Sequence, residues 1–314
     1  MIIDAHSDTI LLATYEKDYE LRENDGHISL MKLKEIDSLC QFFALYIDRD
    51  YFDTKSPYEI FSEMYNMYTE QITKNNDLIL PAYSAEDIFR NREAGKMSAL
   101  LAIEDAVCAE GKIERIDEFF EKGVRAMTLV WNFENELAFP NSVVHEEHMK
   151  GLKPFGLEAI EKMNKLGMLV DVSHLSEGGF YDVAKFSKKP FIATHSCARA
   201  LCNHQRNLTD DQLKTLGKIG GVVGVNFEAS FLKEDSENGT YDQIVEHTKY
   251  MVNKAGIEAV GFGSDFDGIP LAGEIGDCRG FTRLIELLTK HFTDDEIDLI
   301  SYKNMIRILK ENIK

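Results

Sequence analysis

Five side chains that can bind a metal ion stand at or just beyond the ends of short apolar segments. His6 and Asp8 close the segment IIDAHSD, Glu104 ends ALLAIE, His174 follows LVDVS, and His195 ends FIATH. Imidazole nitrogens and carboxylate oxygens are the ligands found in hydrolytic zinc sites. Alternate side chains of a strand share a face, so His6 and Asp8 could reach the same ion. This set predicts a metal centre if the segments end at one place.

Each of these positions also has a purely structural explanation when it is taken alone. Asp8 could cap a helix, and a buried histidine can be satisfied by a backbone carbonyl. Asp265 ends the segment VGFGSD and adds a sixth polar side chain at a comparable position. Repeated coincidence at so many segment ends favours a common site over separate structural roles.

The apolar segments are expected to be strands of one parallel sheet. Strands are predicted over 2–6, 39–46, 98–103, 125–130, 168–172, 190–194, 222–227 and 259–264. Helical spacing predicts helices over 57–73, 84–95, 113–122, 155–166, 176–187, 209–218 and 241–255, and a C-terminal pair over 281–289 and 294–312. Near-continuous apolar strands that alternate with helices indicate a sheet covered on its outer face.

Eight such units predict an α/β fold, a (β/α)8 TIM barrel built as a single domain over residues 1–314. The long segment 47–97 would form a helical insertion between strands two and three and could cover one end of the barrel as a flap. The carboxyl ends of all strands of such a barrel share one rim, where active sites are built. The predicted ligands and Asp265 would therefore meet there.

Charge and cysteine content limit the partners and the compartment. The formal net charge is −19, from 54 acidic and 35 basic residues, which disfavours nucleic acid and anionic membranes as partners. The N-terminus lacks the pattern of a signal peptide, and no apolar run has the length of a membrane span. The odd number of scattered cysteines is typical of reduced thiols, so a cytoplasmic location is expected: Cys40, Cys108, Cys197, Cys202 and Cys278.

Motifs along the whole chain resemble the membrane (renal) dipeptidase family of the amidohydrolase superfamily. They are, in order, IDAHSDT, AIEDA, TLVWNFENELA, GLKPFG, LVDVSH, ATHS, RNLTDDQL, GVVGVNF and VGFGSDFDG. The resemblance implies two Zn²⁺ per chain. His6 and Asp8 would hold one ion, His174 and His195 the other, and Glu104 would bridge them. A hydroxide between the two ions would be the nucleophile.

The same resemblance assigns roles at the substrate. Asp265 would shuttle the proton of the attacking water to the leaving amine and contact the free amino group of a dipeptide. Arg206 would hold the C-terminal carboxylate, a task that suits a planar guanidinium. The alternative for Arg206 is capping of the acidic helix start at residues 210–211. Asp267 is interpreted as a turn or supporting residue.

Two departures from the family pattern are expected to matter. Trp131 stands where many members have a histidine that stabilises the oxyanion, so the Trp131 indole N–H or Asn132 would substitute. Asp105 and Ala106 follow Glu104 where the family usually has two glycines.

The pair His145 and His148 lacks the spacing of HExxH and is interpreted as a surface helix or loop.

The leading hypothesis is a metallodipeptidase acting on a small dipeptide substrate. One alternative keeps the metal centre but hydrolyses another small amide, such as an N-acyl-amino acid or a β-lactam. Another class of function is a non-catalytic barrel that binds metal or peptides, although structural zinc is normally fully ligated by protein. A homodimer is expected from its frequency among oligomers alone.

Overall fold

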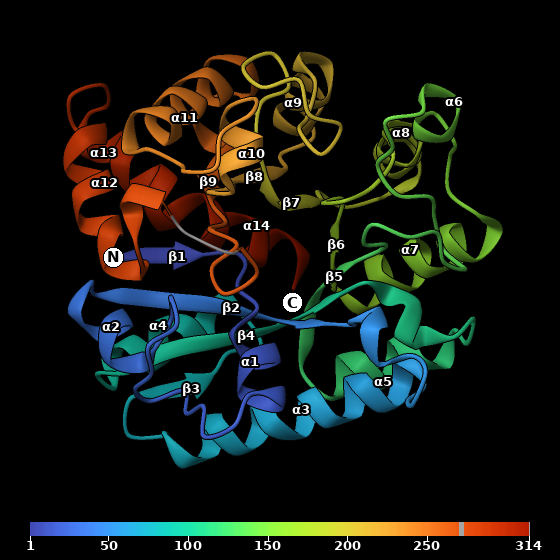
Figure 1. The fold of residues 1–314 in the computed structure, drawn as a ribbon, viewed down its shortest axis with the longest axis horizontal. Helices are drawn as coiled ribbons and strands as arrows, with labels where there is room; N and C mark the ends of the chain where they lie inside the picture. The colour runs from blue at the N-terminus through green and yellow to red at the C-terminus, as the bar shows by residue number, and fades with distance from the viewer. Residues whose placement is uncertain (270–272, 314) are drawn as a thin grey trace.

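Eight parallel strands close into a barrel in the computed structural model, which describes residues 1–269 and 273–313. Each barrel strand pairs in parallel with the next, and β9 returns to β1 through Asp4 and Phe262. The predicted (β/α)8 barrel is therefore confirmed (Figure 1). In chain order the strands are β1 (Ile2–Asp4), β2 (Ser38–Tyr46), β4 (Met97–Glu104), β5 (Val124–Thr128), β6 (Leu169–Asp171), β7 (Ile192–Ser196), β8 (Val222–Val225) and β9 (Val260–Phe262).

A buried carboxylate joins the first strand to both of its neighbours. Asp4 accepts hydrogen bonds from the Ser264 backbone N–H at 2.8 Å and from the Ser264 hydroxyl at 2.7 Å. The Gln41 side-chain amide donates to the same carboxylate at 3.0 Å. Because β1 has only three residues, these side-chain bonds add to a short backbone ladder at the place where the barrel closes.

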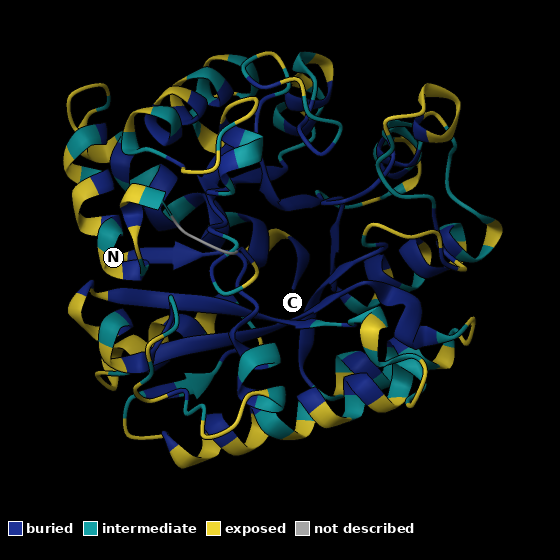
Figure 2. Ribbon diagram, viewed as in Figure 1, coloured by how far each residue is buried: buried dark blue, intermediate teal, exposed yellow. Residues whose placement is uncertain are grey.

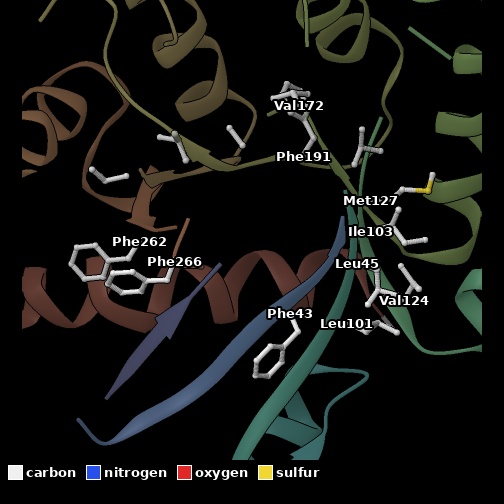
Figure 3. Packing of buried hydrophobic residues seen from close by; sticks show 14 of the residues in the cluster. Phe43, Leu45, Leu101, Ile103, Val124, Met127, Val172, Phe191, Phe262 and Phe266 are labelled. Carbon is white, nitrogen blue, oxygen red and sulfur yellow. The ribbon is translucent and has the colours of Figure 1, made fainter. Parts of the chain in front are cut away.

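Apolar side chains fill the barrel on the inside and attach the helices on the outside. Alternation along β2 sends Phe42 inward and Phe43 outward, and both are fully buried. The inner cluster is closed by the last helix through residues such as Met305 and Leu309. Figure 3 shows part of the outer cluster, including Phe43, Leu45, Leu101 and Ile103. In Figure 2 the barrel strands are largely buried, and exposed residues lie on the outer faces of the helices and in loops.

The insertion after β2 supports the wall of the barrel. It contains α3 (Pro57–Lys74), a short ninth strand β3 (Ile79–Pro81) and α4 (Ala85–Glu93). The strand pairs with β4 outside the barrel ring, and the Tyr68 hydroxyl of α3 donates to the Ala99 carbonyl of β4 at 3.3 Å. The expectation of a flap is wrong for α3, because this helix runs along the outer side of the barrel (Figure 1).

Most predicted helices are confirmed within one or two residues, and one is divided. The predicted helix over 294–312 is α13 (Asp294–Asp298), a π-helical segment (Leu299–Lys303) and α14 (Asn304–Asn312). Three short helices are not predicted from the sequence: α1 (Thr9–Tyr15), α2 (Leu30–Glu35) and α10 (Ala229–Leu232). The remaining helices are α5 (Glu114–Glu121), α6 (His145–His148), α7 (Pro154–Leu166), α8 (Glu177–Phe186), α9 (Asp210–Lys218), α11 (Tyr241–Ala255) and α12 (Phe281–Leu288).

Within the described residues, every helix is too short or too polar to cross a lipid bilayer.

Candidate metal centre

The five predicted metal ligands meet at the carboxyl rim of the barrel. Glu104 is the last residue of β4 and His195 belongs to β7, while His6, Asp8 and His174 lie a few residues beyond β1 and β6. All five side chains are buried. The rim brings them together because parallel strands of a barrel end on the same side.

The Glu104 carboxylate lies between two groups of ligands. Its Oε2 is 3.4 Å from His6 Nε2, which is itself 3.4 Å from Asp8 Oδ2. Its Oε1 is 3.0 Å from His174 Nε2 and 3.5 Å from His195 Nε2. Each oxygen of one carboxylate thus faces a different set of ligands, which is the arrangement that a bridging carboxylate requires.

Several buried polar atoms at this place have no hydrogen-bond partner of their own. His6 Nε2 and Asp8 Oδ1 are both buried and unpaired within the described part of the chain. Buried polar atoms are normally satisfied, so an orphaned nitrogen and an orphaned oxygen side by side need an explanation. A cation that accepts their lone pairs supplies one, and the residues present fit a metal.

Hydrogen bonds set the tautomers of two histidines so that Nε2 carries a lone pair. His174 Nδ1 lies 2.9 Å from Asn132 Oδ1, an oxygen that also accepts from the Asn141 amide at 3.2 Å. An amide oxygen cannot donate, so Nδ1 carries the proton and donates. His174 Nε2 is then free to bind a metal, as is typical of histidine ligands held by a hydrogen-bonded partner.

His195 is held by a short relay. Its Nδ1 lies 2.8 Å from Thr194 Oγ1, and that hydroxyl donates to Asp171 Oδ2. Because the Thr194 hydroxyl donates its proton to the Asp171 carboxylate, its oxygen accepts a hydrogen bond from His195 Nδ1–H. Thr128 Oγ1 also donates to Asp171, at 2.7 Å. Thr194 and Asp171 are not among the predicted site residues, although an aspartate inside the apolar run LVDV is a signal for a buried polar role.

The electrostatics of the centre favour the binding of positive charge. Burial raises the pKa of Glu104 to about 8, although His6 opposes the shift. Burial lowers the pKa of His6, but the carboxylates of Glu104 and Asp8 outweigh it and raise that pKa well above its ordinary value. Without metal, these coupled groups therefore retain a proton between them at neutral pH, at a place that a cation would take.

Asp265 stands beside the ligands at the edge of the cavity. Its Oδ1 is 3.7 Å from His6 Nε2, and its Oδ2 accepts a hydrogen bond from the Asn226 amide at 2.8 Å. Burial raises the pKa of Asp265 to about 6. Its φ of 66° and the 67° of His174 lie in the left-handed region, which is strained for residues with a side chain. Such strain is common at functional sites.

Asp267 has the supporting role expected from the sequence. It accepts hydrogen bonds from the Thr9 hydroxyl at 2.7 Å, from the His27 backbone N–H at 2.6 Å and from the Ile28 backbone N–H at 3.3 Å. These bonds fasten the segment after α1 to the loop after β9.

Arg206 is buried next to the centre and does not line the cavity within the described residues. Its guanidinium donates to Ser196 Oγ at 2.8 Å and to the His195 carbonyl at 2.7 Å, while its Nε has no partner among the described residues. The capping alternative is wrong, because the acids at the start of α9 pair with Lys254 and Tyr181. The ring of Phe231, which does line the cavity, lies 5.8 Å from the guanidinium carbon.

Trp131 and Asn132 both line the same cavity of about 320 Å³. The Trp131 ring packs 4.8 Å from Tyr46 and 6.0 Å from His174 between ring centroids. The Asn132 oxygen is engaged by His174, and its amide nitrogen donates to no acceptor in the described ranges of the chain.

Asp105, at one of the two family glycine positions, adopts a φ of 69°. It accepts from the Asn135 amide at 2.7 Å and lies 3.7 Å from Arg49 of the insertion. The aspartate thus adopts a positive φ, which favours glycine, and its side chain adds bonds of its own.

His145 and His148 belong to the short helix α6, where His145 is exposed as expected; the interpretation as a surface residue is wrong for His148. His148 is buried, and its Nε2 lies 3.0 Å from Arg199.

A parallel barrel with imidazole and carboxylate groups gathered on its carboxyl rim has the architecture of a metal-dependent hydrolase. A family model described as membrane dipeptidase (peptidase family M19) matches residues 1–314. The chain belongs to this family, and it is a metallodipeptidase.

Relatives and solved structures agree with that membership. An uncharacterised dipeptidase of Schizosaccharomyces pombe is 31% identical, over 99% of this chain and 80% of its own length. An uncharacterised protein of Klebsiella pneumoniae from the pqqA 5′ region is 39% identical, over 72% of this chain and 86% of its own length. A metallopeptidase of Rhodobacter sphaeroides, solved with a phosphinate mimic of L-Ala-D-Ala, superposes with a TM-score of 0.90 at 25% identity, over 99% of both chains.

Proposed function

We propose that this metallodipeptidase uses two zinc ions to hydrolyse the amide bond of a dipeptide. His6 and Asp8 would bind one ion, His174 and His195 the other, and Glu104 both. The single observation that carries the proposal is the position of Glu104, whose two oxygens face separate ligand groups. Zinc is favoured because the donors are nitrogen and oxygen atoms that suit a hydrolytic site.

When bound, the two ions would generate a hydroxide nucleophile at neutral pH and polarise the scissile carbonyl. The chain's own residues would handle the protons. Asp265 faces the cavity with its carboxylate held by Asn226, and it would take the proton of the attacking water and pass it to the leaving amine. Burial raises the pKa of Asp265 and nearby cations would lower it, so the carboxylate would begin as a base.

The remaining lining residues would hold the substrate. Asp265 would contact the free amino group. The Trp131 indole N–H and the Asn132 amide nitrogen would donate to the oxyanion of the tetrahedral intermediate. Arg206 would bind the C-terminal carboxylate. This role is supported by its Nε, which has no acceptor among the described residues. To reach the cavity, its guanidinium would have to move past Phe231 or share its bond with Ser196.

A comparison of matched substrates tests the proposal. The zinc-loaded protein should hydrolyse a dipeptide and should not hydrolyse its N-acetylated form, because acetylation removes the amine that Asp265 would bind. Equal hydrolysis of both would favour an N-acyl-amino acid or another amide, such as a β-lactam, as the substrate. Bound metal without hydrolysis of any small amide would favour a binding protein. Metal analysis of the same samples would give the ion and its number per chain.

A cytoplasmic location is part of the proposal, and it is supported by five buried cysteines, all of them free thiols. The homodimer stays a prediction.

A further inference from the structure

Glu228 places an acidic side chain in the wall of the substrate cavity, where the proposed reaction does not use it. It lies between β8 and α10 and is half-buried. Its backbone N–H donates to Asn226 Oδ1 at 2.6 Å, and Asn226 in turn donates to Asp265. One asparagine therefore fixes Glu228 next to the carboxylate that would receive the substrate amine.

The other charged side chains of the cavity wall already have partners or roles. Asp8 and Glu104 belong to the metal centre, and Asp265 to the amine and the proton. Asp267 is engaged by Thr9 and by backbone N–H groups. No lysine or arginine lines the cavity within the described residues. Among the described acids that line the cavity, Glu228 is thus the one with no role at the metals or in proton transfer. The backbone N–H that its carboxylate accepts from belongs to its own helix cap.

Nothing in the described part of the chain neutralises Glu228. Its Oε1 accepts from the Ser230 hydroxyl at 2.8 Å and from the Ser230 backbone N–H at 3.2 Å, and neither oxygen forms an ion pair with another described residue. Glu228 acts electrostatically on His204 and favours its protonated form. Burial, Arg206 and Arg199 lower the pKa of His204, so this imidazole is neutral at neutral pH.

We propose that Glu228 selects dipeptides with a basic side chain, lysine or arginine, in one of their two residues. A half-buried carboxylate without a cationic partner is stabilised by an ammonium or guanidinium group that enters the cavity, and it repels an acidic side chain. The apolar wall formed by Leu11, Phe231 and Ile269 can cover the methylene part of such a side chain. This inference rests on the proposed dipeptidase reaction and names its substrate class.

The bond to Ser230 offers a purely structural role, because Glu228 also caps α10. Glu228→Gln separates the two roles. The glutamine carbonyl can still accept from Ser230, so the cap is kept while the charge is lost. Glu234→Gln, at an exposed position just after α10, is the matched control for the change of net charge.

The experiment measures kcat/KM for pairs of dipeptides that share a four-carbon side chain and differ in the terminal ammonium group, Lys-Ala against norleucine-Ala and Ala-Lys against Ala-norleucine. In the wild type, lysine should be preferred in at least one pair, on the order of tenfold or more. The preference should fall toward one in Glu228→Gln and persist in Glu234→Gln. Calorimetric binding of lysine and norleucine phosphinate pseudodipeptides to the zinc-loaded proteins gives a second readout that does not depend on turnover.

The outcomes separate this inference from the proposed function. Hydrolysis of the norleucine dipeptides without any preference for lysine overturns the inference and leaves the dipeptidase mechanism intact. A lysine preference that survives in Glu228→Gln also overturns it. If no dipeptide is hydrolysed, the proposed function fails, and the binding ratio of the pseudodipeptides still decides whether Glu228 recognises a basic side chain.

Discussion

Replacement of Thr194 by valine tests whether the hydroxyl relay behind His195 prepares this histidine for a metal. Valine has nearly the shape of threonine but lacks the hydroxyl. The change removes the acceptor 2.8 Å from His195 Nδ1 and one donor to Asp171. Asp171 keeps the Thr128 hydroxyl at 2.7 Å and the backbone N–H groups of Ser173 and Thr194 at 2.9 Å. The carboxylate stays satisfied, and the imidazole does not.

The magnitude follows from those two losses. One hydrogen bond to a charged group, worth about 1.5–3 kcal/mol, and one stranded buried donor, costing about 1–3 kcal/mol, together predict a metal-free protein less stable by about 2.5–6 kcal/mol. Without its acceptor, His195 can move its proton from Nδ1 to Nε2, the nitrogen that faces Glu104. Loss of a partner of this kind typically lowers metal affinity about 10–100-fold.

Two measurements check the reasoning. Urea unfolding of the metal-free proteins gives the stability, and competition with a coloured chelator gives the zinc affinity. Thr194→Ser is the matched control, because serine keeps the hydroxyl and should retain most of both quantities. If Thr194→Val binds zinc as tightly as the wild type and unfolds at the same urea concentration, the relay does not control His195.

Three further changes address the metal, the proton and the pH response. Glu104→Gln should lower the zinc bound per chain, seen by metal analysis, without destabilising the metal-free protein, because burial already disfavours the charged carboxylate. Asp265→Asn should retain zinc but reduce kcat by about 10²–10⁴, and unchanged kcat would exclude Asp265 from proton transfer. Buried His247 accepts from the Ala198 N–H at 3.1 Å, and burial lowers its pKa from 6.5. The stability that this neutral imidazole contributes is present above pH 6.5 and is lost as the pH falls. Below pH 6.5, the free energy of urea unfolding should therefore depend less on pH in His247→Gln than in the wild type. An equal dependence on pH in the two proteins would contradict this.

The barrel and the convergence of the ligands could be predicted from the sequence. Apolar runs that alternate with helical spacing define parallel strands, and the closure of the barrel brings their carboxyl ends to one rim. His195 in β7 and Glu104 at the end of β4 are therefore neighbours for a reason that local sequence already contains. The short strand β3 was not predicted, because it lies in a segment whose spacing favours helices. It pairs only with the first residues of β4.

Contacts between different loops were decided only by the tertiary structure. The bond from His174 to Asn132 joins residues 42 positions apart, and the one between Asn226 and Asp265 spans 39. Such pairs depend on loop paths that turn at positive φ, as at His174 and Asp265, and no periodic pattern encodes these turns. The burial of the Arg206 guanidinium behind Phe231 has the same origin. Local sequence determines which groups stand at the rim, because strands repeat regularly; the folded loops determine which atoms face one another, because that depends on the whole packed chain.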